Sequence, residues 1–120
     1  MTILAFPKPN PFKRFLSLES VAPFYPFPIF GDDLDEPFGF IPDAPGVIAL
    51  GSSNGEATVI EACRSMRERV ESHWKGFEGG ATVSATFLAF EATANPMRRE
   101  EELLREHRQR FGVLPVLNRA

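Results

Sequence analysis

Residues 59–73 are the most informative stretch for the fold, and their sequence is Val-Ile-Glu-Ala-Cys-Arg-Ser-Met-Arg-Glu-Arg-Val-Glu-Ser-His. The pattern predicts the end of a strand, a short turn and the start of a helix. Arg69 and His73 fall one helical turn apart, and residues four positions apart on a helix share a face. A guanidinium group and an imidazole ring are therefore expected to point in the same direction.

Regular elements are predicted on both sides of this stretch. Asn54-Gly55 is the strongest short signal for a hairpin turn. Asn95 and Pro96 are typical of a helix start, and Gly112 is typical of a helix end. The predicted elements are strands at 46–50, 57–61 and 82–92 and helices at 64–75 and 96–111, followed by an extended tail. The order ββαβα predicts an α+β domain with a small antiparallel sheet over residues 45–120.

Residues 1–44 have a different composition. Nine of the eleven prolines lie at or before Pro45, and eight of the twelve phenylalanines lie at or before Phe40. Proline lacks an N–H donor and favours extended geometry in the residue before it. We therefore predict a long extended arm, and its aromatic content is unlike that of disordered segments. The arm is expected either to cover its own domain or to dock on a protein partner or a second copy.

The overall composition is that of one soluble domain. The chain has 120 residues, 43% of them hydrophobic and 24% charged. A net charge of −3 argues against a dedicated nucleic-acid binder, although residues 96–120 carry six arginines and four glutamates. Cys63 is the only cysteine, and we expect neither a signal peptide nor a membrane-spanning segment. A cytoplasmic protein without a membrane partner is expected.

The order and spacing of these motifs resemble the GIY-YIG nuclease domain. That family has a Gly-Ile-Tyr strand, a Tyr-Ile-Gly strand, an arginine ten residues after the second tyrosine and often a histidine four residues later. Gly46 matches the first strand, and the spacing counted from Val59 reaches Arg69 and His73. Ile48 and Val59 stand at the positions of the two tyrosines.

The last part of the chain extends this resemblance. The helix that carries Glu100 is similar to a Glu-x-x-Leu-Ile-Lys helix found in the family, and Pro115-x-x-Asn118 matches the Pro-Asn ending of other members. In an active member the glutamate holds Mg²⁺ and the arginine binds phosphate, while the tyrosines position and deprotonate water. The resemblance therefore implies Arg69, His73, Glu100 and Asn118 as catalytic residues and Glu100 as the metal ligand. No cofactor is expected otherwise.

Three substitutions bear on activity. Ile48 and Val59 cannot accept a proton, and general-base assistance is worth about 10²–10⁴ in rate. His73 is a candidate replacement base, since an unperturbed imidazole titrates near neutrality. Glu61 replaces the glycine of the second motif, where a carboxylate either repels phosphate or adds a metal ligand.

Structural interpretations compete with these assignments. Arg69 and His73 have Glu68 and Glu71 as neighbours, which is also the pattern of a solvated, salt-bridged helix face. Glu100 to Glu102 are expected in a first helical turn, where acidic residues interact favourably with the helix dipole without any metal. His107 is expected to contribute to packing, and Cys63 is expected to be an inert thiol.

Three functions remain open at this point. The first is a degenerate GIY-YIG-like domain that serves as a non-catalytic binding or structural module, such as a subunit of a larger assembly. In such a module, either Arg69 is expected to be buried in an ion pair or the arm is expected to fill the groove. The second is a divergent Mg²⁺-dependent endonuclease that cleaves DNA. The third is an unrelated small α+β interaction protein.

Overall fold

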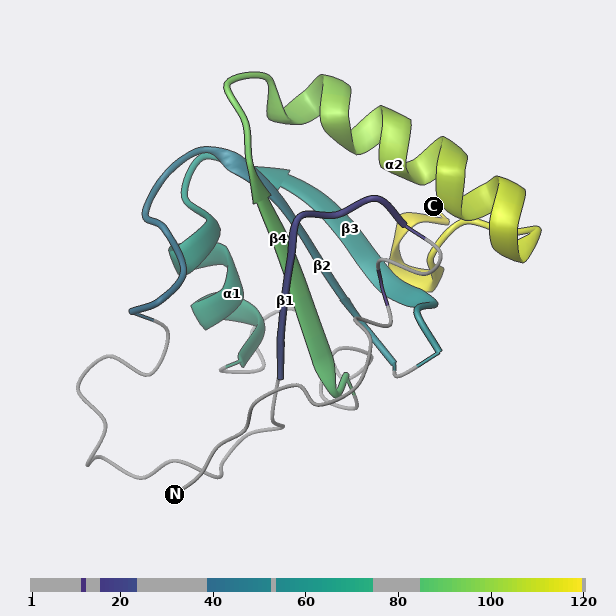
Figure 1. Cartoon of the computed structure of the whole chain (residues 1–120), viewed down its shortest axis with the longest axis horizontal. Coiled ribbons are helices and arrows are strands. Elements are labelled where there is room, and N and C mark those ends of the chain that lie inside the picture. The colour runs from purple at the N-terminus through teal and green to yellow at the C-terminus, as the bar shows by residue number, and fades with distance from the viewer. Residues whose placement is uncertain (1–11, 13–15, 24–38, 53, 75–84, 120) are drawn as a thin grey trace.

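The computed structural model describes residues 12, 16–23, 39–52, 54–74 and 85–119 (Figure 1). Its elements are β1 (Ser20–Pro23), β2 (Gly46–Gly51), β3 (Ala57–Cys63), α1 (Met66–Trp74), β4 (Phe87–Ala92), α2 (Pro96–Phe111) and the 3₁₀ turn η2 (Val116–Asn118). A four-stranded antiparallel sheet and two helices make up the described fold, which confirms the predicted α+β class. In this part of the chain, neither helix has the length and hydropathy needed to cross a membrane.

The sheet has the strand order β1-β4-β2-β3, and every neighbouring pair is antiparallel. The turn between β2 and β3 contains Gly55 at a φ of 90°, a conformation that glycine adopts without steric cost. This turn confirms the predicted hairpin. Because β2 pairs with β3 on one side and with β4 on the other, β3 is left at the edge of the sheet.

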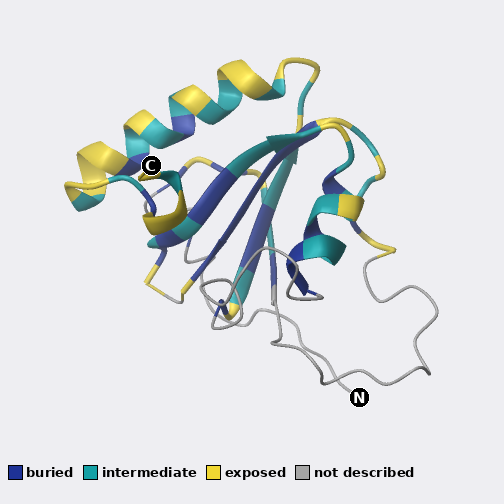
Figure 2. Ribbon diagram, turned by 180° about the vertical axis from the view of Figure 1, so that it is seen from behind, coloured by how far each residue is buried: buried dark blue, intermediate teal, exposed yellow. Residues whose placement is uncertain are grey.

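The two helices cover opposite faces of the sheet (Figure 1). On one face, Ile48, Leu50 and Val59 pack with three residues of α1, namely Met66, Val70 and Trp74. On the other face, Val47, Ala49 and Ile60 pack with Leu103 of α2. Successive residues of a strand point to opposite faces, and a sheet covered on both sides therefore has continuously apolar strands, as β2 does. Figure 2 shows exposed residues along the outer side of α2.

Part of the predicted arm belongs to this core. Residues 20–23 form β1, which pairs with β4 from Ser20 opposite Phe90 to Pro23 opposite Phe87. Phe12, Leu16 and Leu18 are fully buried in the cluster beneath α2. These described residues therefore follow the first of the two expectations for the arm, in which it covers its own domain. The remainder of the arm, residues 1–11, 13–15 and 24–38, lies outside the described residues.

Several predicted boundaries are shifted by tertiary contacts. β3 continues to Cys63 rather than to residue 61, since Cys63 pairs with Gly46. β4 begins at Phe87, which pairs with Gly51 at the end of β2. Residues 82–84 of the predicted strand lie outside the described residues. The tail is not wholly extended, because η2 forms a turn in which the Asn118 N–H donates to the Pro115 carbonyl at 2.8 Å.

The predicted ends of the helices agree with the structure better than the predicted ends of the strands do. α1 begins at Met66 rather than at residue 64, after Ser65, whose Oγ accepts from the Glu68 N–H at 3.2 Å. α2 begins and ends as predicted, with Asn95 as its cap and Gly112 in the left-handed region. Residue 75, the predicted end of this helix, lies outside the described residues. Glu100 is the fifth residue of α2, so the first-turn interpretation of the acidic residues is wrong.

Candidate functional site

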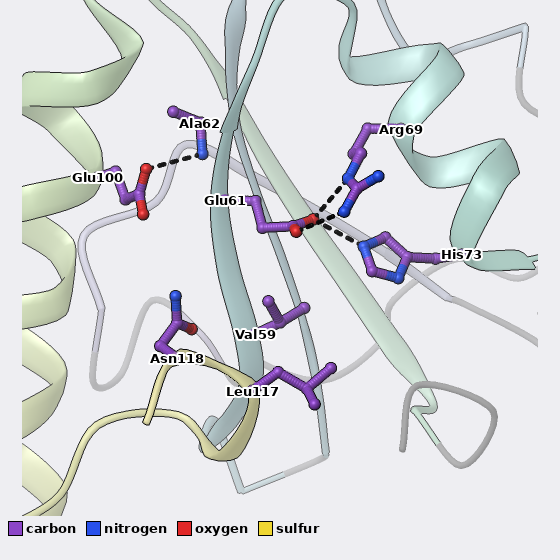
Figure 3. Close-up of a pocket in the computed structure, with 8 residues that line it drawn as sticks. All are labelled: Val59, Glu61, Ala62, Arg69, His73, Glu100, Leu117 and Asn118. Atoms are coloured by element: carbon purple, nitrogen blue, oxygen red, sulfur yellow. Dashed lines mark hydrogen bonds and ion pairs between the residues drawn. The ribbon is translucent and has the colours of Figure 1, made fainter. Parts of the chain in front are cut away.

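The candidate site is a pocket of about 400 Å³ beside the outer edge of β3 (Figure 3). Strand β3, helices α1 and α2 and the turn η2 each contribute residues to its wall. The lining consists of Val59, Glu61, Ala62, Arg69, His73, Glu100, Leu117 and Asn118. All four candidate site residues from the sequence, Arg69, His73, Glu100 and Asn118, therefore line one pocket although they are spread over 50 positions.

Glu61 binds both candidate residues of α1. Arg69 donates from Nε to Oε1 at 2.9 Å and from Nη2 to Oε2 at 2.7 Å, so the guanidinium grips the carboxylate with two bonds. Nε2 of His73 lies 2.7 Å from Oε1 of the same carboxylate. We call Glu61, Arg69 and His73 the pocket cluster. Its geometry results from β3 packing beside α1, with Val59, Glu61 and Cys63 on the α1 face of the strand.

The charge on Glu61 is strongly stabilised. Burial raises the pKa of this carboxyl, but hydrogen bonds and favourable charge interactions with His73 and Arg69 outweigh burial and lower the pKa from 4.5 to about 2. Glu61 is therefore ionised throughout the physiological range. A bidentate guanidinium–carboxylate pair is among the stronger charge-assisted contacts in proteins.

His73 is enclosed rather than open to the cavity. Its side chain is 1% exposed, and Nε2 faces Glu61. Nδ1 is buried and has no hydrogen-bond partner within the described residues. A general base needs a nitrogen within reach of the water that it activates. In this arrangement neither ring nitrogen meets that requirement.

Glu100 and Asn118 hold the backbone of β3. Oε1 of Glu100 accepts from the Ala62 N–H at 3.2 Å. The side chain of Asn118 makes two bonds to Ile60, since Oδ1 accepts from its N–H at 2.9 Å and Nδ2 donates to its carbonyl at 3.0 Å. The resemblance assigns both residues to catalysis, whereas their contacts in the described structure are with an edge strand.

His107 holds β3 in the same way, at the opposite end of the strand. It is fully buried, its Nε2 accepts from the Ala57 N–H at 3.1 Å, and its Nδ1–H donates to the Val113 carbonyl at 2.8 Å. Burial lowers the pKa of His107 below 6.5, which favours this neutral tautomer. The ring also stacks at a tilt on Phe111, with centroids 4.6 Å apart. We call Glu100, His107 and Asn118 the edge caps.

The positions of the two missing tyrosines lie on the pocket side of the sheet. Val59 is 3% exposed and lines the cavity, whereas Ile48 is fully buried in the core beneath α1. In the sheet Ile48 pairs with Glu61, and Leu50 pairs with Val59. The pocket wall at this place is apolar and offers no group that orients or deprotonates water.

The side chains that line this pocket are poorly arranged to bind a metal ion. Among the residues that the structure describes, no group of three or more His, Cys, Asp or Glu side chains is arranged to hold an ion. Glu100 already accepts from Ala62, and the charge of Glu61 is compensated by Arg69. The pocket therefore supplies no second uncompensated carboxylate beside Glu100.

Cys63 lies next to the pocket cluster, and its thiol is in an environment that makes it unreactive. Its Sγ is 3.4 Å from the Gly46 carbonyl, to which the thiol donates. Burial raises the pKa of this thiol to about 12, and the negative charge of Glu61 adds to the shift. Because the thiolate is the nucleophilic form, this geometry supports the expected inert thiol.

Two partnerships were beyond sequence reasoning. Glu61 precedes Arg69 by eight positions and His73 by twelve, and no helical or strand periodicity connects them. The bonds of His107 to Ala57 and Val113 likewise have no local signal. In both cases the only relevant clue is a buried polar residue type, which indicates that a partner exists but not which one.

Comparison of the chain with protein families, with curated proteins and with solved structures found no match to any of the three.

Proposed function

We propose that this chain is a non-catalytic binding module with a degenerate GIY-YIG-like domain. The observation that carries the proposal is the pocket cluster, in which the carboxylate of Glu61 occupies the donors of Arg69 and His73. In an active member, the arginine would bind a phosphate group. Here a carboxylate of the chain itself takes the place of that anion.

The charges of the pocket support this proposal. Two carboxylates, Glu61 and Glu100, and one guanidinium, Arg69, line the cavity. A phosphodiester entering it would have to displace a tethered carboxylate from Arg69 and then remain close to both negative charges. Like charges at such distances repel each other, most strongly where water is excluded. The pocket is thus poorly suited to bind the backbone of DNA.

The proposed partner is a protein. The net charge of −3 disfavours a polyanion, and the chain carries exposed apolar side chains at Phe40, Val113 and Val116. Exposed apolar residues of this kind are better matched to a protein surface than to phosphate.

A divergent endonuclease is the second candidate, because Arg69, His73, Glu100 and Asn118 converge on one pocket. It requires Glu61 to leave Arg69 when substrate binds. The two candidates therefore differ in the role of Glu61, which is a permanent occupant in the first and a movable one in the second.

The deciding experiment measures metal-dependent cleavage of single-stranded, duplex, branched and flapped DNA. The wild-type protein is compared with Glu100→Ala and with Glu61→Gly, which restores the glycine of the family motif. We expect no cleavage by wild type beyond that of Glu100→Ala, with either Mg²⁺ or Mn²⁺. Glu101→Ala is the matched control, since Glu101 is an exposed neighbour of Glu100 on α2. Cleavage by wild type and Glu101→Ala that disappears in Glu100→Ala would establish the endonuclease instead.

A further inference from the structure

The edge strand β3 is closed by side chains where a further strand would otherwise pair. Its Ala57, Ile60 and Ala62 N–H groups donate to His107, Asn118 and Glu100 at 3.1, 2.9 and 3.2 Å. Two of these acceptors lie on α2 and the third on η2. Edge strands expose a row of backbone donors and acceptors, and proteins protect such rows against pairing with other chains.

Asn118 reproduces the bonding of a neighbouring strand. Its carboxamide has the same donor and acceptor as a peptide group, and it exchanges both with Ile60 at 2.9 and 3.0 Å. In an antiparallel ladder, a hydrogen-bonded pair of residues exchanges the same two bonds. The outward groups of Ile60 are therefore already oriented to receive an antiparallel strand.

The sequence of β3 makes it prone to pair with itself. Its seven residues, Ala-Thr-Val-Ile-Glu-Ala-Cys, include β-branched residues and a single charge. Short segments of high β-propensity and low charge are those that associate when exposed. In an antiparallel pairing of two β3 strands centred on Ile60, Val59 of one copy would face Glu61 of the other. The charged residues would thus not oppose each other, and the pairing is free of like-charge repulsion across the strands.

We propose that the edge caps, Glu100, His107 and Asn118, keep β3 from pairing antiparallel with β3 of a second copy. Asn118 is the displaceable member, since it lies in a three-residue turn in which Val116 is 49% and Leu117 is 40% exposed. Loss of the caps opens a binding edge whose occupant is a second copy of this chain. This inference rests on the backbone bonds of β3 and does not depend on whether the pocket is catalytic.

The test uses the full chain with Asn118→Ala and with Asn118→Ala combined with Glu100→Ala. Amide hydrogen exchange followed by NMR reports the edge itself, and sedimentation velocity over a wide concentration range reports association. We expect the Ile60 amide to exchange about tenfold faster in Asn118→Ala, the effect of losing roughly one hydrogen bond. The double variant is expected to form a concentration-dependent dimer with isotope-filtered NOEs between Val59 of one copy and Glu61 of the other.

Matched controls are Arg119→Ala and Glu101→Ala, which change exposed neighbours of the two caps. Both are expected to remain monomeric with an unchanged Ile60 amide. Should the double variant not fold, Asn118→Ala alone serves in its place at the highest concentrations, because it removes both bonds to Ile60. A folded variant that stays monomeric at every concentration overturns the proposal. A dimer without the Val59–Glu61 contact also overturns it, and so does an Ile60 amide that exchanges at the wild-type rate.

Discussion

Polar side chains on the pocket side of β3 and those at its outer edge form different kinds of hydrogen bond. On the pocket side, Glu61, Arg69 and His73 satisfy one another through charged side-chain contacts. At the outer edge, the caps instead satisfy the backbone of the strand. The resemblance assigns Arg69, His73, Glu100 and Asn118 to one catalytic site. In this structure the first two bind Glu61, whereas the last two bind the backbone of β3.

The largest loss of stability is expected at the edge, from His107→Ala. This change leaves the Ala57 N–H and the Val113 carbonyl without their partner and creates a cavity at a fully buried site. Each unsatisfied buried group costs about 1–3 kcal/mol, so the free energy of unfolding should fall by roughly 3–5 kcal/mol. Chemical denaturation measures it, with the exposed neighbour Arg108→Ala as control. A loss below about 1 kcal/mol would show that the edge tolerates an open donor.

The pocket side should dominate the response to acid. The pKa of Glu61 is lowered to about 2 in the folded protein, from 4.5. Its contribution is therefore fully present above pH 4.5 and is lost as the pH falls towards 2. Because the carboxylate is partly exposed, we expect roughly 2–3 kcal/mol from this step. Denaturation curves at several pH values should show the step in wild type and not in Glu61→Gln.

The edge should respond at a higher pH than the pocket. The pKa of His107 is lowered by burial, so its contribution is present above pH 6.5 and declines as the pH falls below that value. Protonation of Nε2 would remove the acceptor for the Ala57 N–H. NMR titration of the ring and exchange of the Ala57 amide should change together, before the acid step of Glu61. A His107 ring that titrates above 6.5 would contradict this order.

The smallest effect on the free energy of unfolding is expected from the single interaction between Glu61 and Arg69. A double-mutant cycle of Glu61→Gln and Arg69→Met isolates the coupling of these side chains, which are 22% and 34% exposed. Solvent screening limits such a pair, so we expect about 1–2 kcal/mol. The exposed pair Arg98–Glu102 on α2 is the control and should couple by less than about 0.5 kcal/mol. Equal coupling in the two pairs would mean that Glu61 does not lock Arg69.

Elements with strong local signals were predicted well from the sequence. The Asn54-Gly55 turn, the start of α2 at Pro96 and its end before Gly112 all depend on backbone preferences of a few adjacent residues. β1 was not predicted, because residues 20–23 lie among prolines and become a strand only by pairing with β4, almost 70 positions away. Four of the residues that line the pocket, Arg69, His73, Glu100 and Asn118, were named from the sequence as candidates, but their hydrogen-bond partners were not.

Local sequence is enough to predict the α+β class, the hairpin, the limits of α2 and the placing of Arg69 and His73 on one helical face. These features depend on side-chain periodicity and on the conformational limits of glycine, proline and asparagine, which act over a few residues. The bonds of Glu61 to Arg69 and His73 form only in the folded chain, and so do the bonds by which Glu100, His107 and Asn118 close the edge of β3. The reason is that hydrogen-bond partners of buried polar groups are selected by proximity in the folded chain, and β3 meets α1, α2 and η2 only after the sheet has formed.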